Sequence, residues 1–159
     1  DRSHRDKVPY AVWRDQGFIE ATPGAVIDYG FILQKIDEMA RLYDLQAILF
    51  DRWGATKIIQ EIEQQDLTVL EFGQGFKDMS PPTKEMMKLI LEKRIRFPEN
   101  PVMRWCASNI VVEQDAAGNV KISKKRSIEK VDVMVAAVMA LDGAIRNAAQ
   151  KVEPSIVWI

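Results

Sequence analysis

The chain is poor in the residues that build disulfides, zinc sites and thiol catalysis. Its 159 residues contain one cysteine, Cys106, and one histidine, His4. A single cysteine cannot form an internal disulfide, and one histidine is too few for a convincing Cys/His zinc cluster or Cys–His nucleophile pair. These absences leave zinc and thiol chemistry without support and fit a reducing, cytoplasmic setting.

Long apolar runs and an excess of one charge are also missing. No uninterrupted apolar stretch approaches the roughly 18–20 residues that a membrane-spanning helix needs, and the charged start of the chain is unlike a secretory signal. The 22 Lys and Arg nearly balance the 23 Asp and Glu, so the formal net charge is −1. We therefore expect no membrane contact, and any nucleic-acid contact has to come from local basic patches.

The amino-acid composition is that of an ordinary globular protein. Hydrophobic residues make up 47% of the chain and charged residues 28%, which suffices for one core. No repeat or linker divides the sequence, so we expect a single domain over residues 1–159. Helical and strand patterns alternate along the chain, which predicts an α/β fold with an at least partly parallel sheet.

Hydrophobic periodicity predicts the individual elements. Ser80, which two prolines follow, and Ser127 are each expected to cap a helix, whereas residues 1–7 are expected to fray. The expected helices cover residues 8–13, 28–43, 58–62, 80–91, 102–108 and about 128–149. The expected strands cover residues 18–21, 47–50, 67–72, 110–115 and 120–123.

Asp51 is the first candidate functional residue. It follows the apolar run 47–50, expected to be a strand buried on both faces, and precedes a glycine turn and a helix. Open α/β sheets gather their ligands at such strand ends. A carboxylate there can ligate a metal or act in catalysis; the alternative is an Asp that caps the following helix.

Asp132 is the second candidate. It lies in the first turn or two of the last expected helix, where the helix dipole favours an anion. Its helix face continues with small residues, including Ala140 and Gly143, so this flank can approach a sheet closely. An ionised acid on a close-packed flank needs a partner, and the options are Lys130, Arg126 or a divalent cation.

Together the two acids suggest metal-assisted hydrolysis. The chain between them is long enough to bring Asp132 back to Asp51. Mg²⁺ prefers carboxylates together with water and phosphate oxygens, and two metals about 4 Å apart can activate water in phosphodiester hydrolysis. A third acid is expected from another strand, for which Glu20 is the weak candidate.

A basic patch adjoins Asp132. Beside a metal-binding acid such a patch can guide phosphates; the alternative is a mobile surface loop. A second basic cluster, over residues 84–96, is diluted by acids and is explained by a solvated helix face. The loop 72–77 lacks the spacing of a nucleotide-binding loop, so ATP binding has no support. The basic residues near Asp132 are Lys121, Lys124, Lys125, Arg126 and Lys130.

Longer sequence patterns resemble the C-terminal nuclease part of tailed-phage terminase large subunits, over nearly the whole chain. In chain order these patterns are Val8-Pro9-Tyr10-x-x-Trp13, Thr22-Pro23-Gly24, Asp51-Arg52-Trp53, Phe72-Gly73-Gln74-Gly75-Phe76, Met79-Ser80-Pro81-Pro82, Asn100-Pro101-Val102-x-Arg104-Trp105, Asp115-x-x-Gly118-Asn119 and Lys130-Val131-Asp132.

The resemblance implies a ribonuclease H-like mixed sheet flanked by helices, and a metal-dependent endonuclease that cuts concatemeric viral DNA by two-metal hydrolysis. In that family three acids hold two Mg²⁺ or Mn²⁺ ions, and Asp51 and Asp132 match two of the three. Asp28 and Asn109 match motif positions to which we assign no role; helix capping and core hydrogen bonding are the structural alternatives.

The resemblance also implies partners. Double-stranded viral DNA would contact the basic patch and Arg52, and the terminase small subunit and the portal would join the assembly in the cytoplasm of the infected bacterial host. The family's first acid lies upstream of the Val8-Pro9-Tyr10 segment. We therefore expect a chain that lacks the first strands and the ATPase motor, with weakened metal binding and little or no cleavage.

Two other functions are compatible with parts of the sequence. The chain could be a non-catalytic interaction module of the packaging machinery, which pairs with partners through an exposed sheet edge and the apolar tail Val157-Trp158-Ile159. The chain could also be a receiver-like domain that is phosphorylated on Asp51. Such a domain requires an acid pair near the start of the chain, which is absent.

Overall fold

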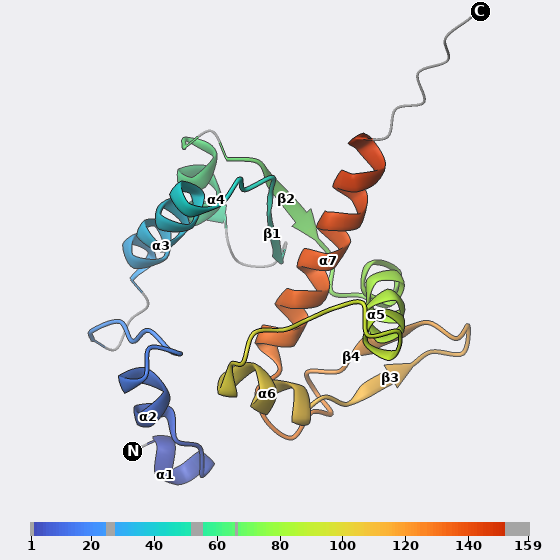
Figure 1. Cartoon of the computed structure of the whole chain (residues 1–159), viewed down its shortest axis with the longest axis horizontal. Helices are drawn as coiled ribbons and strands as arrows, with labels where there is room; N and C mark the ends of the chain where they lie inside the picture. Colours follow the sequence, from blue (N-terminus) through green and yellow to red (C-terminus); the bar gives the residue numbers. More distant parts are fainter. Residues whose placement is uncertain (1, 25–27, 52–55, 66, 152–159) are drawn as a thin grey trace, which may run out of the picture.

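The structure is a computed structural model that describes residues 2–24, 28–51, 56–65 and 67–151. Helices dominate it, and four short strands form two separate pairs (Figure 1). The described elements are α1 (Arg2–Asp6), α2 (Tyr10–Asp15), α3 (Tyr29–Leu42), β1 (Ile48–Asp51), α4 (Thr56–Glu63), β2 (Val69–Phe72), α5 (Phe76–Leu91), α6 (Pro101–Ser108), β3 (Val112–Gln114), β4 (Val120–Ile122) and α7 (Asp132–Lys151).

The two strand pairs differ in direction. β1 and β2 run parallel, with Leu49 opposite Leu70 and Asp51 opposite Phe72. β3 and β4 form an antiparallel hairpin. The expected α/β fold, the partly parallel pairing and the hairpin are therefore confirmed. The single mixed sheet that the resemblance implies is not, because the described strands form two separate sheets. No strand in the described part of the chain pairs with the other edge of β1.

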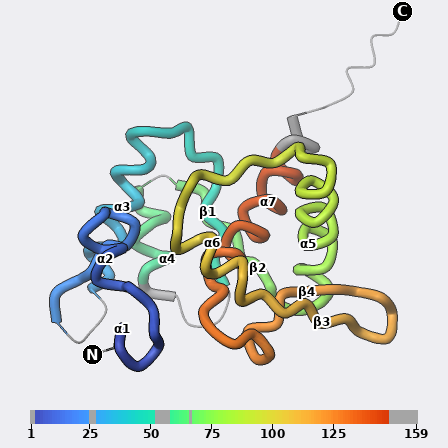
Figure 2. The backbone as a smooth tube through the Cα atoms, turned by 60° about the horizontal axis from the view of Figure 1, so that its bottom comes forward, coloured from blue at the N-terminus to red at the C-terminus, as the bar shows by residue number. Residues whose placement is uncertain are grey.

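Helix α7 organises the core. It lies between the β1–β2 pair and α5 (Figures 1 and 2). Its apolar face packs on side chains from β2, α5, α6 and β4, and burying a Met or Val side chain of this kind is worth about 1.5–3 kcal/mol. The described residues of this buried cluster are Phe72, Met79, Met86, Cys106, Ile122, Val131, Met134, Val135, Val138 and Met139.

Most of the expected helices are confirmed, two of them with their caps. Asp28 caps α3 by accepting a hydrogen bond from the Gly30 amide at 2.9 Å, which gives this motif residue the capping role. Asn100 caps α6 in the same way, by accepting from the Val102 amide at 2.9 Å. Both caps satisfy amides that the first turn of a helix leaves without partners.

The N-terminal expectations are partly wrong. Residues 2–6 form helix α1 instead of fraying. Residues 18–21 form no strand, because the backbone turns back after α2 and the Phe18 amide donates to the Trp13 carbonyl at 2.8 Å. Glu20 therefore does not lie on a strand. Its carboxylate forms an ion pair with Lys35 of α3.

Neither serine expected to cap a helix stands at a helix start, and each has another partner. Helix α5 begins at Phe76 and carries Pro81 and Pro82 in its interior, while Ser80 is 3% exposed and accepts from the Val120 amide at 3.1 Å. Helix α7 begins at Asp132. Ser127 donates to the Ser123 carbonyl at 2.7 Å, so it ties the preceding loop together. None of the described helices is long and apolar enough to cross a bilayer.

Candidate metal and nucleic-acid site

Asp51 lies at the end of β1, on the sheet face that looks toward α7. Side chains alternate along a strand, so Asp51 shares its face with Leu49. The Leu49 side chain packs against Gly143 of α7, where a Cβ would come within 2.7 Å of Leu49 Cδ1. Both strand residues are half-buried. The expected burial of this strand on both faces is therefore wrong.

Asp132 is the first residue of α7, and its side chain is 65% exposed. The expected partners, Lys130 and Arg126, are wrong, because the carboxylate pairs with Lys124 at a Nζ–Oδ1 distance of 3.2 Å. The small flank expected on this helix face is confirmed by the contact between Gly143 and Leu49. An exposed carboxylate in a solvated ion pair remains accessible to a cation.

Asp51 and Asp132 belong to the facing sides of β1 and α7, at different heights along the helix. Gln46 bonds Asn147 at 3.3 Å and Leu49 contacts Gly143, so β1 runs opposite to α7 and Asp51 points toward the N-terminal half of the helix. We count from the contact of Leu49 with Gly143, with a rise of about 1.5 Å per residue in the helix and about 3.3 Å in the strand. The Asp132 backbone then lies roughly 10 Å beyond the level of Asp51 along the axis of α7.

A groove separates the β1–β2 pair from the small-residue flank of α7. We call it the sheet–helix groove; its volume is about 820 Å³. Leu70 of β2 and Met139 of α7 line it together with Ala136 and Ala140. Ala136, Ala140 and Asp132 recur at four-residue steps, so Asp132 continues the same helix face.

A third carboxylate does not join the two. Glu71 is opposite Phe50 in the β1–β2 register, which puts it on the sheet face away from Asp51. Glu20 is held by Lys35. Residues 2–24, 28–51, 56–65 and 67–151 contain no group of three or more His, Cys, Asp or Glu side chains that could hold a metal ion. Within the described residues, at most two such side chains could therefore contribute to one metal site.

The basic patch near Asp132 lies on the loop between β4 and α7, residues 124–130, which we call the basic loop. Lys125 and Lys130 are exposed, whereas Arg126 Nε lies 3.9 Å from a Glu113 carboxylate oxygen. Hydrogen bonds from Lys121 and Ser123 to Glu113 hold the pKa of that carboxyl below its usual range. Arg52, the remaining predicted DNA contact, lies outside the described residues.

Several hydrogen bonds hold the basic loop in place. Ser127 Oγ accepts from the Val111 amide at 3.3 Å and donates to the Ser123 carbonyl. Asn109 Nδ2 donates to the Lys130 carbonyl at 3.4 Å, which gives this second motif residue a structural role. These bonds favour an ordered basic patch over the alternative of a mobile surface loop.

Two lysines and two acids, one of them Glu129, line a hollow at the N-terminus of α7. Its volume is about 280 Å³, and its lining includes Lys124, Lys130 and Asp132. The two lysines can hold anionic groups such as phosphates next to the Asp132 carboxylate. This juxtaposition suits a charged substrate that has to be brought close to a carboxylate.

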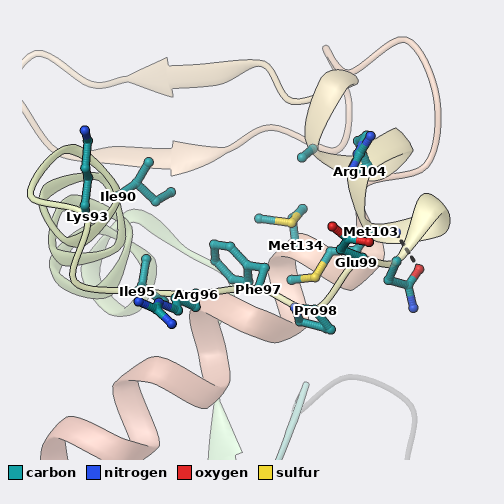
Figure 3. A pocket seen from close by; sticks show the side chains of 12 residues that line it. Ile90, Lys93, Ile95, Arg96, Phe97, Pro98, Glu99, Met103, Arg104 and Met134 are labelled. Atoms are coloured by element: carbon teal, nitrogen blue, oxygen red, sulfur yellow. Dashed lines mark hydrogen bonds between the residues drawn. The ribbon is translucent and has the colours of Figure 1, made fainter.

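A larger hollow of about 650 Å³ lies between α6 and the segment that follows α5 (Figure 3). Phe97, Met103 and Met134 supply apolar walls, and Arg96 and Arg104 supply positive charge. The sequence prediction of a solvated helix face missed this hollow, because only the fold brings α6 against the 95–100 segment. Glu99 is its one acidic lining residue, so it lacks the paired acids of the proposed chemistry.

Comparison with known proteins agrees with the resemblance seen in the sequence. Residues 1–148 match the family described as "Terminase large subunit, endonuclease domain". The chain belongs to this family. As a terminase endonuclease domain it is 39% identical over 146 residues to the terminase large subunit of Enterobacteria phage HK97, covering 91% of the chain and 29% of that protein.

One further relative and one solved structure also match the chain. Protein YmfN of Escherichia coli (strain K12) is 32% identical over 136 residues, which cover 84% of the chain and 30% of YmfN. The crystal structure of the HK97 bacteriophage large terminase matches with a TM-score of 0.82 at 39% identity, over 89% of this chain and 30% of that one. The chain thus spans about 30% of the length of these relatives.

Proposed function

We propose that the chain is the nuclease portion of a phage DNA-packaging terminase large subunit, which cuts concatemeric double-stranded DNA with Mg²⁺ or Mn²⁺ in the infected bacterial host. The observation that carries the proposal is the contact of Leu49 with Gly143, because Asp51 shares the strand face of Leu49 and Asp132 shares the helix face of Gly143. The parallel β1–β2 pair crossed by a long helix supports a ribonuclease H-like core. The small subunit and the portal are the proposed protein partners.

The donor chemistry of the two acids fits a hard divalent cation. Carboxylate oxygens are the ligands that Mg²⁺ prefers, and exposed Asp132 can exchange its lysine partner for a metal. Ligand oxygens at opposite ends of a two-metal site are up to about 8 Å apart. The axial offset of roughly 10 Å between the two backbones therefore favours one ion for each acid over a single shared ion.

The protein's own residues would place the DNA. When bound, the two ions would activate a water molecule and stabilise the leaving oxygen of the phosphodiester. Lys130 and Lys124 would hold the backbone phosphates over the hollow beside Asp132, and Lys125 and Arg126 would contact neighbouring phosphates. Since no third acid joins them in the described residues, we expect the isolated 159-residue chain to bind metal weakly and to cleave little.

Calorimetry with Mn²⁺ tests this assignment on the chain itself. We expect saturable heat for the unaltered chain. Asp51→Asn and Asp132→Asn should each lower the Mn²⁺ affinity by about tenfold or more, as the loss of a metal contact does. Asp15→Asn is the matched control, because Asp15 is an exposed acid on α2 that pairs with Arg14. In a protein with nicking activity, both site variants should abolish Mn²⁺-dependent nicking. Undiminished nicking would defeat the assignment.

A second function, a non-catalytic interaction module, is favoured by one observation. The described residues gather no three-acid cluster. The sheet–helix groove presents exposed apolar Leu70 of β2, and no strand among the described residues pairs with the other edge of β1. Such an edge can pair with a partner strand. The same calorimetry separates the two functions, because the module predicts no saturable heat with Mn²⁺ for the unaltered chain.

A further inference from the structure

Ile128 is an apolar side chain in the middle of the basic loop, and it is 86% exposed. Single exposed hydrophobic residues are ordinary on protein surfaces, so the exposure alone decides nothing. Whether Ile128 has a function depends on its neighbours in the chain and in space.

Hydrogen bonds fix the backbone of the basic loop both before and after Ile128. The preceding residue, Ser127, is tied by its hydroxyl to Ser123 and Val111. After it, the Lys130 carbonyl accepts from Asn109. The chain then enters the core at Val131, which is 2% exposed. An isoleucine between such anchors is presented to solvent at little further cost in loop entropy.

Ile128 lies in a segment with a net positive charge. Residues 124–130 carry four cationic side chains and one acid, and Ile128 lines the same hollow as Lys124, Glu129, Lys130 and Asp132. This charge fits a polyanion, whereas an apolar protein partner would favour an uncharged rim. An apolar tip in a positively charged segment matches the way proteins wedge side chains such as Ile between base steps of duplex DNA.

We propose that Ile128 inserts between base pairs of the DNA duplex and kinks it beside Asp132. The proposal rests on the proposed endonuclease function and adds a DNA-distorting residue to it. Unstacking a base step costs a few kcal/mol, which the phosphate contacts of the lysines in the basic loop offset. Pyrimidine–purine steps such as TA unstack most easily. Ile128 would therefore bias the site of contact toward these steps.

A duplex that carries 2-aminopurine at TA steps tests the wedge with the full 159-residue chain. 2-Aminopurine brightens when it unstacks, and anisotropy of a dye on the same duplex reports binding. Both are measured at low salt in EDTA, so that cleavage plays no part. Leu91→Ala is the matched control, because Leu91 is 81% exposed on α5, outside the basic loop.

We expect the unaltered chain and Leu91→Ala to raise the fluorescence several-fold at saturation. Ile128→Ala should still bind, within about threefold of the original affinity, and should raise the fluorescence little. Ile128→Met, which keeps an apolar tip, should restore most of the rise. Equal rises for Ile128→Ala and the unaltered chain would overturn the wedge while leaving the nuclease assignment standing. No binding by the unaltered chain would overturn both.

Discussion

Gly143 of α7 and Leu49 of β1 are in direct contact, and no side chain fits between them. A Cβ on Gly143 would lie 2.7 Å from Leu49 Cδ1, 3.4 Å from Cδ2 and 3.6 Å from Cγ. This contact fixes how closely the helix that carries Asp132 approaches the strand that carries Asp51. The small-residue flank of α7 therefore sets the width of the sheet–helix groove.

Substitutions at Gly143 should follow the size of the new side chain. Gly143→Ala gains about 1 kcal/mol in helix propensity and costs about 0.5–1.5 kcal/mol as Leu49 turns toward the groove, so its net effect should be within about 1 kcal/mol. Gly143→Leu should destabilise by about 1–3 kcal/mol through overpacking. Urea denaturation measures both, and equal stability of the two variants would contradict the close contact.

Lys124 should control how easily a cation reaches Asp132. Exposed ion pairs contribute about 0–1 kcal/mol, so Lys124→Met should leave folding unchanged and strengthen Mn²⁺ binding by up to about fivefold in calorimetry. DNA affinity should fall, and the slope of log affinity against log salt concentration should become shallower by about one, as expected for the loss of one phosphate contact. Lys88→Met is the control, since Lys88 pairs with Glu85 on α5. Tighter metal binding by that variant as well would contradict a local effect.

Asp115 should make the β3–β4 hairpin sensitive to acid. Hydrogen bonds from Asn119, and a further one from the Ala117 amide, lower the pKa of the Asp115 carboxyl. Because the pKa is depressed in the folded state, the stabilisation is present above the unfolded pKa of about 3.9 and is lost as the pH falls through the lower folded value.

The thermal melts of Asp115→Asn and the unaltered chain should therefore differ at pH 7 and draw together as the pH falls below the unfolded pKa of about 3.9. We expect the variant to melt a few degrees lower at pH 7. A gap that stays constant from pH 7 to pH 3 would show that the charge of Asp115 is not what stabilises the turn. Asp15→Asn serves again as the control, with no change at either pH.

Ser80 should matter more than its position in a helix suggests. Its hydroxyl is buried and accepts from the Val120 amide, 40 residues away. Ser80→Ala leaves that amide without a partner, which costs about 1–3 kcal/mol. Ser108→Ala removes an exposed hydroxyl that bonds only the nearby Trp105 carbonyl, and it should cost much less. Faster amide exchange at Val120 in the first variant alone would confirm the link.

The sequence predicted best those elements whose own side chains decide them. The three- and four-residue spacing of apolar side chains predicted helix α3, which is confirmed, and of the two alternatives for Asp28 the structure shows the cap. Helices α5 and α7 were placed correctly but begin elsewhere, because Ser80 and Ser127 accept from the distant amides of Val120 and Val111, which only the tertiary fold brings near. The strand expected over residues 18–21 is absent for a local reason, since the chain turns back onto α2 there.

The candidate site was predicted in part. The small flank of α7 was readable from sequence because four-residue spacing maps directly onto a helix face, and the contact of Gly143 with Leu49 confirms it. The pairing of Asp132 with Lys124 was not predicted, because it depends on how the basic loop folds back over the helix start. Metal binding by Asp51 and Asp132 stays a prediction that calorimetry can test.

The contribution of α7 to the core bears on synthesis as well as on stability. Half of the ten described residues in the buried cluster come from residues 131–139, and the other half come from residues 72–122. A ribosome makes the chain from its N-terminus, so Phe72, Met79 and Met86 leave it well before the helix that covers them. Until α7 arrives these side chains have no cover, and a nascent chain in that condition is prone to aggregate or to need a chaperone.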